Sequence, residues 1–360
     1  MTIALSHGGP TIYTSNGKSD ELLVGTAKGI TTLRRDGDGW KVAGTVLPQQ
    51  HVSAILLHGG DIYAGAYGDG SLRVSHDGGS TWSLADNGLS EKNVFSLEAV
   101  EHNGDTRLYA GTEPAKLFVS DDLGASWTER PSLREVPTVE SWSFPGPPHV
   151  AHAKHITADP ANPNVMYVSI EVGGLLRSDD GGETWRDVPG MYEDVHRLVI
   201  NPSAPERRYV TGGNGLYASQ DGGDSWEHWT DTAHEIGGYP DQLCFHPRNP
   251  DVMFIASAKD GPGTWMRSHF AGARVSRSTD GGRHWEVMRN GLPDRMQGNI
   301  EAMALEDWGG GISVFAGTTS GEIFASDDGG DSWQLIATDL APVSKGGHYI
   351  PLMQPAGAAH

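Results

Sequence analysis

The chain has 360 residues, with 26 basic and 46 acidic side chains and a formal net charge of -20. This acidic balance argues against a nucleic-acid surface or a polybasic membrane anchor. No stretch approaches the roughly 18 consecutive apolar residues of a membrane span, and the first residues lack the basic and apolar regions of a secretory signal. We therefore expect a cytoplasmic protein without nucleic-acid or membrane partners. Cys244 is the single cysteine, so His, Asp and Glu remain as possible metal ligands.

An octapeptide of the form S-x-D-x-G-x-S/T-W recurs along the chain and organises the predicted elements. Complete copies end at Trp82, Trp127, Trp185, Trp226 and Trp333, a copy without the hydroxyl ends at Trp285, and a worn copy ends at Trp40. The sequence between successive copies has the length and composition of about three short strands, and a fourth strand begins at each Trp. Seven such units predict an all-β, seven-bladed β-propeller of four-stranded blades.

The innermost strand of each unit supplies the predicted site. In chain order, aligned apolar positions place the starts of these strands at His51, Asn93, His152, Asp194, Tyr239, Asn299 and His348. The first unit lacks an inner strand, so we expect residues 346–354, GGHYIPLMQ, to close the ring. Residues 1–360 then form one domain. Insertions at about 131–152 and 259–275 are expected over the face opposite the octapeptides, where loops commonly carry binding sites.

The octapeptides resemble the Asp-box (BNR) repeats of sialidases, sortilin-type receptors and photosystem II assembly-factor propellers. The resemblance covers nearly the whole chain and implies a fold but not a function. It implies that the Asp and Ser/Thr of each copy fix a turn, so the aspartates of the six better-preserved copies are structural: Asp77, Asp122, Asp180, Asp221, Asp280 and Asp328. A sialidase would need an arginine triad, an early Arg-Ile-Pro-like motif and a Tyr-Glu pair. No Arg precedes Arg34, which argues against that activity.

Histidines from four units converge, by this alignment, on one end of the channel. They are His51, His152, His155, His196 and His348. Neutral imidazoles are common ligands of zinc, copper, iron and nickel, and three or four of them with an open position suit a catalytic metal. We predict such a transition metal and expect no organic cofactor. A metal-free polar pocket and a merely hydrated channel are the alternatives.

Further polar and aromatic residues are predicted on the same face. The catalytic candidates are Glu113, Glu171, Glu301 and Arg197, and the substrate-binding candidates are Trp142, Trp265, His269, Tyr67, Asn93 and Asn299. Together with the histidines they favour a metal-dependent lyase, hydrolase or oxidase acting on a small or sugar-like organic substrate. A non-catalytic binding or assembly-factor propeller and a metal-free glycosidase with paired Glu residues are the competing hypotheses. The sequence leaves the substrate and the oligomeric state open.

Overall fold

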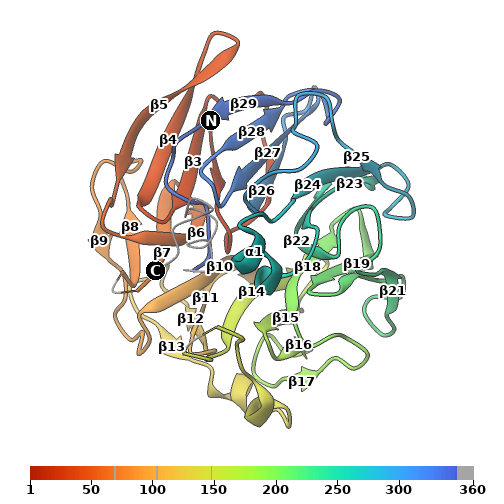
Figure 1. The fold of residues 1–360 in the computed structure, drawn as a ribbon. Helices are drawn as coiled ribbons and strands as arrows, with labels where there is room; N and C mark the ends of the chain where they lie inside the picture. Colours follow the sequence, from red (N-terminus) through yellow and green to blue (C-terminus); the bar gives the residue numbers. More distant parts are fainter. Residues whose placement is uncertain (69, 103, 147, 347–360) are drawn as a thin grey trace.

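Seven β-sheets stand around a central axis in the computed structural model, which describes residues 1–68, 70–102, 104–146 and 148–346 (Figure 1). Each sheet is one blade, and its strands run from the channel outward. The prediction of a seven-bladed propeller with four-stranded blades is confirmed. The inner strands are buried on both faces because each lies between two neighbouring blades. The second strands pack just as closely: in β7 (Asp61–Tyr67), a side chain at Gly65 would meet Val94 Cγ1 of the next blade at 2.7 Å, which explains the small residue there.

The strands of each blade are given from the channel outward. Blades one to three contain β1 (Thr2–Leu5), β3 (Glu21–Thr26), β4 (Gly29–Asp36) and β5 (Gly39–Val46); β6 (His51–His58), β7 (Asp61–Tyr67), β8 (Leu72–Ser75) and β9 (Ser83–Leu84); and β10 (Asn93–His102), β11 (Asp105–Glu113), β12 (Leu117–Ser120) and β13 (Thr128–Glu129). Blades four and five contain β14 (His152–Asp159), β15 (Asn162–Glu171), β16 (Gly174–Ser178) and β17 (Arg186–Asp187); and β18 (Val195–Asn201), β19 (Ala204–Gly212), β20 (Gly215–Ser219) and β21 (Glu227–Thr230). Blades six and seven contain β22 (Tyr239–His246), β23 (Asn249–Ala258), β24 (Arg274–Ser278) and β25 (Glu286–Val287); and β2 (Ile12–Thr14), β26 (Ile300–Asp307), β27 (Ile312–Thr318), β28 (Ile323–Ser326) and β29 (Gln334–Ala337).

The ring closes at its N-terminal end, which differs from the prediction. The inner strand of blade one is β1, which pairs in parallel with β3, and β2 adds a fifth strand inside β26 of blade seven. Thr2–Leu5 occupies the inner position that residues 346–354 were expected to fill, and residues 347–354 lie outside the described part of the chain. His348 lies outside the described residues. The apolar run Ile3–Leu5 was short enough to be missed as a strand.

The octapeptides form the turns expected of them. In the second blade, Asp77 Oδ1 accepts hydrogen bonds from Ser75 Oγ and from the Thr81 amide at 2.8 Å each, and Oδ2 accepts from Thr81 Oγ1 at 2.7 Å. The same contacts recur at Asp122, Asp180, Asp221 and Asp328, and at Asp280 a histidine replaces the hydroxyl. The predicted structural role of these aspartates is confirmed.

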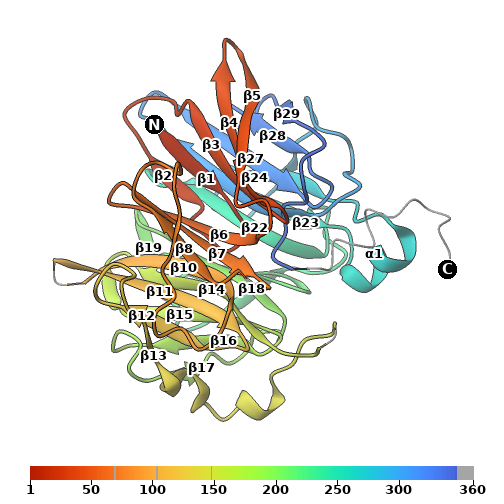
Figure 2. The same cartoon turned by 90° about the vertical axis from the view of Figure 1, so that its left-hand side faces the viewer.

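Both insertions form short helical segments. The first holds the 3₁₀ turns η1 (Pro131–Arg134) and η2 (Val139–Ser141), and the second holds α1 (Pro262–Ser268). Helix α1 projects from one face of the ring and, seen along the axis, overlies its centre (Figures 1 and 2). No helix in the described part of the chain is long and apolar enough to cross a membrane.

Candidate functional site

A β-bulge recurs near the start of the inner strands of blades two to seven. In β14, for example, Ala153 pairs with Ile170 and His155 with Ser169, so that Lys154 between them has no partner in the register. The equivalent extra residues are Ser53, Phe95, Lys154, His196, Asp241 and Glu301. A bulge re-aims the side chain of its extra residue. Four neighbouring blades thereby contribute a buried ring of charged and polar groups.

Glu171, the last residue of β15, is the centre of a buried ion network. Both of its carboxylate oxygens accept hydrogen bonds from the Lys345 ammonium, at 2.6 and 2.7 Å. His152 Nε2 donates to Oε2 at 2.8 Å, and Lys154 Nζ lies 3.2 Å from the same oxygen. Burial alone would raise the pKa of Glu171, but the charges of Lys154 and Lys345 lower it well below its ordinary value. Glu171 is therefore ionised at neutral pH.

Lys154 connects Glu171 to a second buried carboxylate, Asp241. Lys154 Nζ lies 3.1 Å from Asp241 Oδ1, and Asn299 Nδ2 donates to Oδ2 at 3.2 Å. Burial opposes the charge on Asp241, yet the two lysines hold its pKa below the usual range. Burial lowers the pKa of Lys154, and the two carboxylates counteract that shift. One ammonium group thus bridges blades four and six across the channel.

Glu113, at the end of β11, has surroundings opposite to those of Glu171 although both lie next to His152. Its Oε1 accepts a hydrogen bond from Asn93 Nδ2 at 3.1 Å, and its Oε2 lies 3.6 Å from His152 Nδ1. Desolvation raises the pKa of Glu113, and Asn93 offsets only part of the rise. Burial lowers the pKa of His152 and favours its neutral form. Since Nε2 donates to Glu171, Nδ1 presents a lone pair toward Glu113.

His196 has a ring orientation fixed by a backbone contact. Its Nδ1 donates to the Pro240 carbonyl at 2.7 Å, and the ring packs 4.5 Å from the ring of Tyr239. Its Nε2 lies 3.2 Å from Asp194 Oδ1 and 4.0 Å from Glu171 Oε1. His196 is fully buried, whereas Asp194 is 17% exposed and faces the cavity above.

A cavity of about 800 Å³ opens above this network, on the face of α1. Its floor includes His152, Glu171 and Asp241, while Glu113 and Asp194 lie in its wall. Aromatic side chains from the inner strands, from the two insertions and from nearby loops complete the lining: Tyr67, Phe95, Phe144, Tyr192, Tyr239 and Trp265. An enclosed, largely apolar pocket with a few converging polar groups is typical of a small-molecule site.

The N-terminal segment crosses the channel beneath the network. Gly8 donates its amide hydrogen to Ser53 O at 2.9 Å and accepts from the Leu97 amide at 3.1 Å, so that it touches blades two and three. A side chain at Gly8 would meet Phe95 O at 1.8 Å, which requires glycine there. Arg197 of blade five donates to the carbonyl of His7 from the opposite side. The segment closes the channel below the cavity.

The structure brings five of the predicted catalytic, substrate and metal residues into the cavity lining: Tyr67, Glu113, His152, Glu171 and Trp265. Asn93 and Asn299 lie behind the lining and hold the carboxyl groups of Glu113 and Asp241. Glu301 lies deeper and accepts hydrogen bonds from Ser344 Oγ and the Lys345 amide.

Two other predicted residues sit in structural positions. The Trp142 ring covers Gly173, and its Nε1 donates to Thr138 Oγ1 at 3.2 Å. His269 caps the C-terminus of α1 in the left-handed conformation, at φ 54°. Trp265 is buried rather than presented as a flat platform, and its Nε1 donates to Asp260 O at 2.6 Å.

The predicted histidines are spread over the channel rather than gathered around one point. His51 Nε2 donates to Ser344 O at 2.8 Å, and the Tyr67 and Phe95 rings lie between His51 and His152. His155 lies deeper and accepts a hydrogen bond from Arg197 at 2.5 Å. Two groups of three potential ligands occur within the described residues, His7–Asp241–Glu301 and Glu171–Asp194–His196. His196 is the one predicted ligand that belongs to either group.

Sequence reasoning missed several cavity residues, among them Lys345, Phe144 and Tyr192. Lys345 was overlooked because it immediately precedes residues 346–354, the segment that was expected to close the ring. Phe144 and Tyr192 lie in loops, where the strand alignment gives no position. The Phe144 ring lies 5.1 Å from that of His152. The sequence signal that could have identified Phe144 is its position in the Pro- and Gly-rich part of the first insertion.

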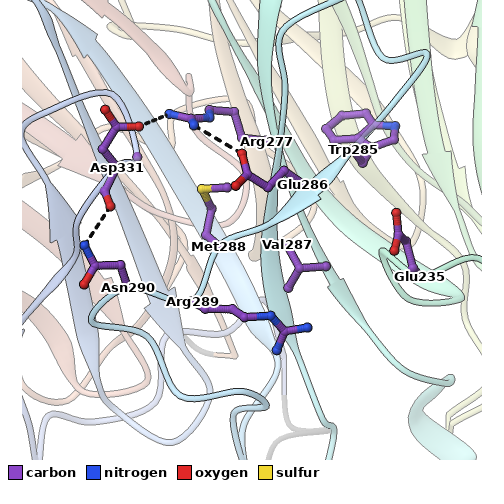
Figure 3. Close-up of a pocket in the computed structure, with 10 residues that line it drawn as sticks. Glu235, Arg277, Trp285, Glu286, Val287, Met288, Arg289, Asn290 and Asp331 are labelled. Atoms are coloured by element: carbon purple, nitrogen blue, oxygen red, sulfur yellow. Dashed lines mark hydrogen bonds and ion pairs between the residues drawn. The ribbon is translucent and has the colours of Figure 1, made fainter.

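A second cavity, of about 530 Å³, lies between blades six and seven beside the last octapeptide (Figure 3). Arg277 dominates its lining and is already paired, with Asp331 at 2.6 Å and with Glu286 at 3.3 Å. Asn290 Nδ2 donates to Asp331 O at 3.0 Å. These contacts join two blades and leave no converging set of unpaired polar groups among the residues just named. The first cavity, which contains Glu113, His152 and Glu171, is therefore the candidate site.

Comparison with known proteins connects this geometry to two kinds of propeller. Residues 173–297 match the family model Sortilin-Vps10, described as sortilin, neurotensin receptor 3. Xyloglucanase Xgh74A of Acetivibrio thermocellus is 26% identical over 286 residues, which cover 67% of this chain and 32% of the relative. Photosystem II assembly lipoprotein Ycf48 of Synechococcus sp. is 25% identical over 268 residues, which cover 73% of this chain and 68% of the relative. The chain thus spans about a third of the length of the xyloglucanase.

One solved structure shows the same fold over nearly its whole length. The structure of YCF48 bound to D1 peptide superposes with a TM-score of 0.59 at 14% identity, covering 90% of this chain and 94% of the other. The chain is similar to Asp-box propellers in sequence and in fold. The resemblance seen in the octapeptides is confirmed, and the relatives include both hydrolases and an assembly factor.

Proposed function

We propose that the chain is a glycoside hydrolase whose active site is the cavity under α1, with Glu113 as the proton donor and Glu171 as the ionised carboxylate. The observation that carries this proposal is the opposite environment of the two groups on the two sides of His152. Desolvation raises the pKa of Glu113, whereas Lys154 and Lys345 lower that of Glu171 against the effect of burial. A carboxyl pair with separated pKa values is the usual acid and stabiliser pair of glycosidases.

The chemistry follows from these proton positions. Glu113 donates its proton to the glycosidic oxygen, the bond from that oxygen to the anomeric carbon breaks, and the fixed negative charge of Glu171 stabilises the cationic sugar. Water then adds to the anomeric carbon and releases one proton, and Glu113 regains a proton from solvent. His152 Nδ1 lies 3.6 Å from Glu113 Oε2, beside the proton donor. These steps use residues of the chain alone.

The lining of the cavity favours a neutral sugar. Tyr67, Phe144 and Tyr192 offer aromatic surface for the apolar faces of sugar rings, and Tyr192 is 43% exposed. The net charge of -20 disfavours a strongly anionic glycan. The similarity to xyloglucanases supports a sugar polymer or oligosaccharide of this type.

Release of reducing ends from neutral β-glucans and xyloglucan oligosaccharides tests the proposal. Glu113→Gln should lower kcat by about 10²- to 10⁴-fold, the contribution of a positioned acid. The wild-type rate should fall as the pH rises through the raised pKa of Glu113, because the donor then loses its proton. Glu101→Gln, at the far end of β10 in the same blade, is the matched control and should leave the rate unchanged. An unchanged rate in Glu113→Gln would exclude this residue as the proton donor.

A second candidate, a peptide-binding propeller, is favoured by the length of the match. The YCF48 structure is covered over 94% of its length, whereas the xyloglucanase is covered over 32%. Under this alternative no glycan is cleaved, and short peptides bind in the cavity. Fluorescence polarisation with a labelled decapeptide library, repeated with Tyr192→Ala, distinguishes the two functions.

A further inference from the structure

Three atoms that accept hydrogen bonds face one another at the edge of the cavity. His196 Nε2, Asp194 Oδ1 and Glu171 Oε1 lie within 4.8 Å of one another. Among the described residues, neither His196 Nε2 nor Asp194 Oδ1 has a hydrogen-bond partner, and His196 is fully buried. The Pro240 carbonyl can only accept, so the proton of the neutral ring is on Nδ1 and the lone pair on Nε2. Such a group is unfavourable in a buried site unless positive charge lies between its members.

We infer that Glu171, Asp194 and His196 bind a divalent metal cation. Two ligands placed about 2.0 to 2.2 Å from a metal, at tetrahedral or octahedral angles, are separated by about 3.0 to 3.5 Å. The 3.2 Å between His196 Nε2 and Asp194 Oδ1 fits this range. Glu171 Oε1, at 4.0 Å from Nε2, lies outside it and would have to move toward the ion, away from the Lys345 ammonium that it contacts at 2.6 Å. The contact of Nδ1 with the Pro240 carbonyl is the kind that orients metal-binding histidines. One imidazole and two carboxylates suit Mn²⁺, Fe²⁺ or Zn²⁺.

The Lys345 ammonium already balances the charge of Glu171. Asp194 and His196 should therefore contribute most of the binding energy of the ion. The ligand set differs from the predicted cluster of histidines because the bulge in β18 turns His196 toward the carboxylates of blades four and five. The inference goes beyond the proposed hydrolysis, whose steps use no metal; an ion on Glu171 would neutralise the carboxylate that stabilises the cationic sugar, so bound metal should inhibit hydrolysis. Binding is measured without any glycan, so its outcome is independent of the hydrolase assay.

Titration of the full chain with Mn²⁺, after chelator treatment and dialysis, tests the site. Electron paramagnetic resonance of free Mn²⁺ and calorimetry should give one bound ion per chain, and Zn²⁺ should displace it. Asp194→Asn and His196→Gln should each weaken binding at least tenfold while thermal unfolding shows a folded protein. Asp61→Asn breaks a surface His–Asp pair, 2.8 Å from His76, and should bind as wild type does.

Two results would overturn the inference. Wild type that binds no Mn²⁺ or Zn²⁺ at millimolar concentration would show that a proton on His196 balances the site. Binding that survives both Asp194→Asn and His196→Gln would place the ion elsewhere. If one site variant fails to fold, the other still decides between these outcomes.

Discussion

Replacing Lys154 by methionine tests whether the buried ion network holds the propeller together. Lys154 is fully buried and lies 3.2 Å from Glu171 and 3.1 Å from Asp241. Methionine has a similar length but no charge, so the bridge between the two carboxylates is lost. Removing one partner of a buried ion pair costs about 3 to 5 kcal/mol. With an unfolding entropy of about 2.1 cal/mol/K per residue, this loss lowers the Tm of a chain of this length by about 4 to 7 °C.

The size of this loss depends on pH, and its sign follows from the two carboxylates. In the wild type their pKa values lie below the unfolded values, so their contribution is complete at neutral pH and is lost as the pH falls through the lowered folded values. In Lys154→Met both pKa values rise, and a carboxylate takes up a proton as the pH falls toward about 4. The difference in stability between variant and wild type should therefore shrink toward acid pH.

Calorimetric unfolding from pH 8 down to about pH 3.5, across the expected protonation of the carboxylate, measures the effect, and two further variants control it. Lys92→Met removes an exposed ion pair with Asp86 and should change the Tm little. Lys154→Met combined with Asp241→Asn should recover part of the loss, because one unpaired charge is removed with its partner. A Lys154→Met loss of stability below about 1 kcal/mol, or one that does not vary with pH, would refute the account of the network.

Two smaller predictions follow from the turns and the helix. Asp221→Ala removes the acceptor for Ser219 Oγ and for the amide and hydroxyl of Ser225, so its circular dichroism melt should occur at lower temperature than that of wild type or of the exposed neighbour variant Asp224→Ala. Trp265→Ala removes a buried indole that packs edge-on against Tyr239, which should cost about 3 to 5 kcal/mol in chemical denaturation and raise KM more than it lowers kcat.

The fold was predictable because its signal is local and repeated. Each octapeptide carries its own turn chemistry, visible in the three contacts of Asp77 with Ser75 and Thr81, and these turns mark the outer half of every blade but the first. The closing strand was not predictable in this way. Strand β1 has four residues and pairs in parallel with β3, with no turn between them that a sequence pattern would reveal.

The location of the site was predictable from the sequence, but the contacts between its side chains were not. Alignment of the inner strands placed His152 at one end of the channel, and Glu113 and Glu171, at the ends of second strands, were predicted on the same face, where the cavity is found. The bulges were invisible, because one extra residue in a strand changes which side chain reaches the centre without changing the apolar pattern. Lys154 and His196 are turned inward by such bulges, whereas His51 remains beside its neighbours.

Both ends of the described chain reach the site, which couples ring closure to the assembly of the network. His7 lies beneath it, with Nδ1 donating to Glu301 O at 2.9 Å, and Lys345 contacts Glu171 from the segment that follows blade seven. That segment is held at the seam between blades seven and one, where the Val343 amide donates to Thr318 O and the Ala27 amide to Pro342 O. The ammonium that fixes the charge of Glu171 is thus held in place by the contacts that join blades seven and one.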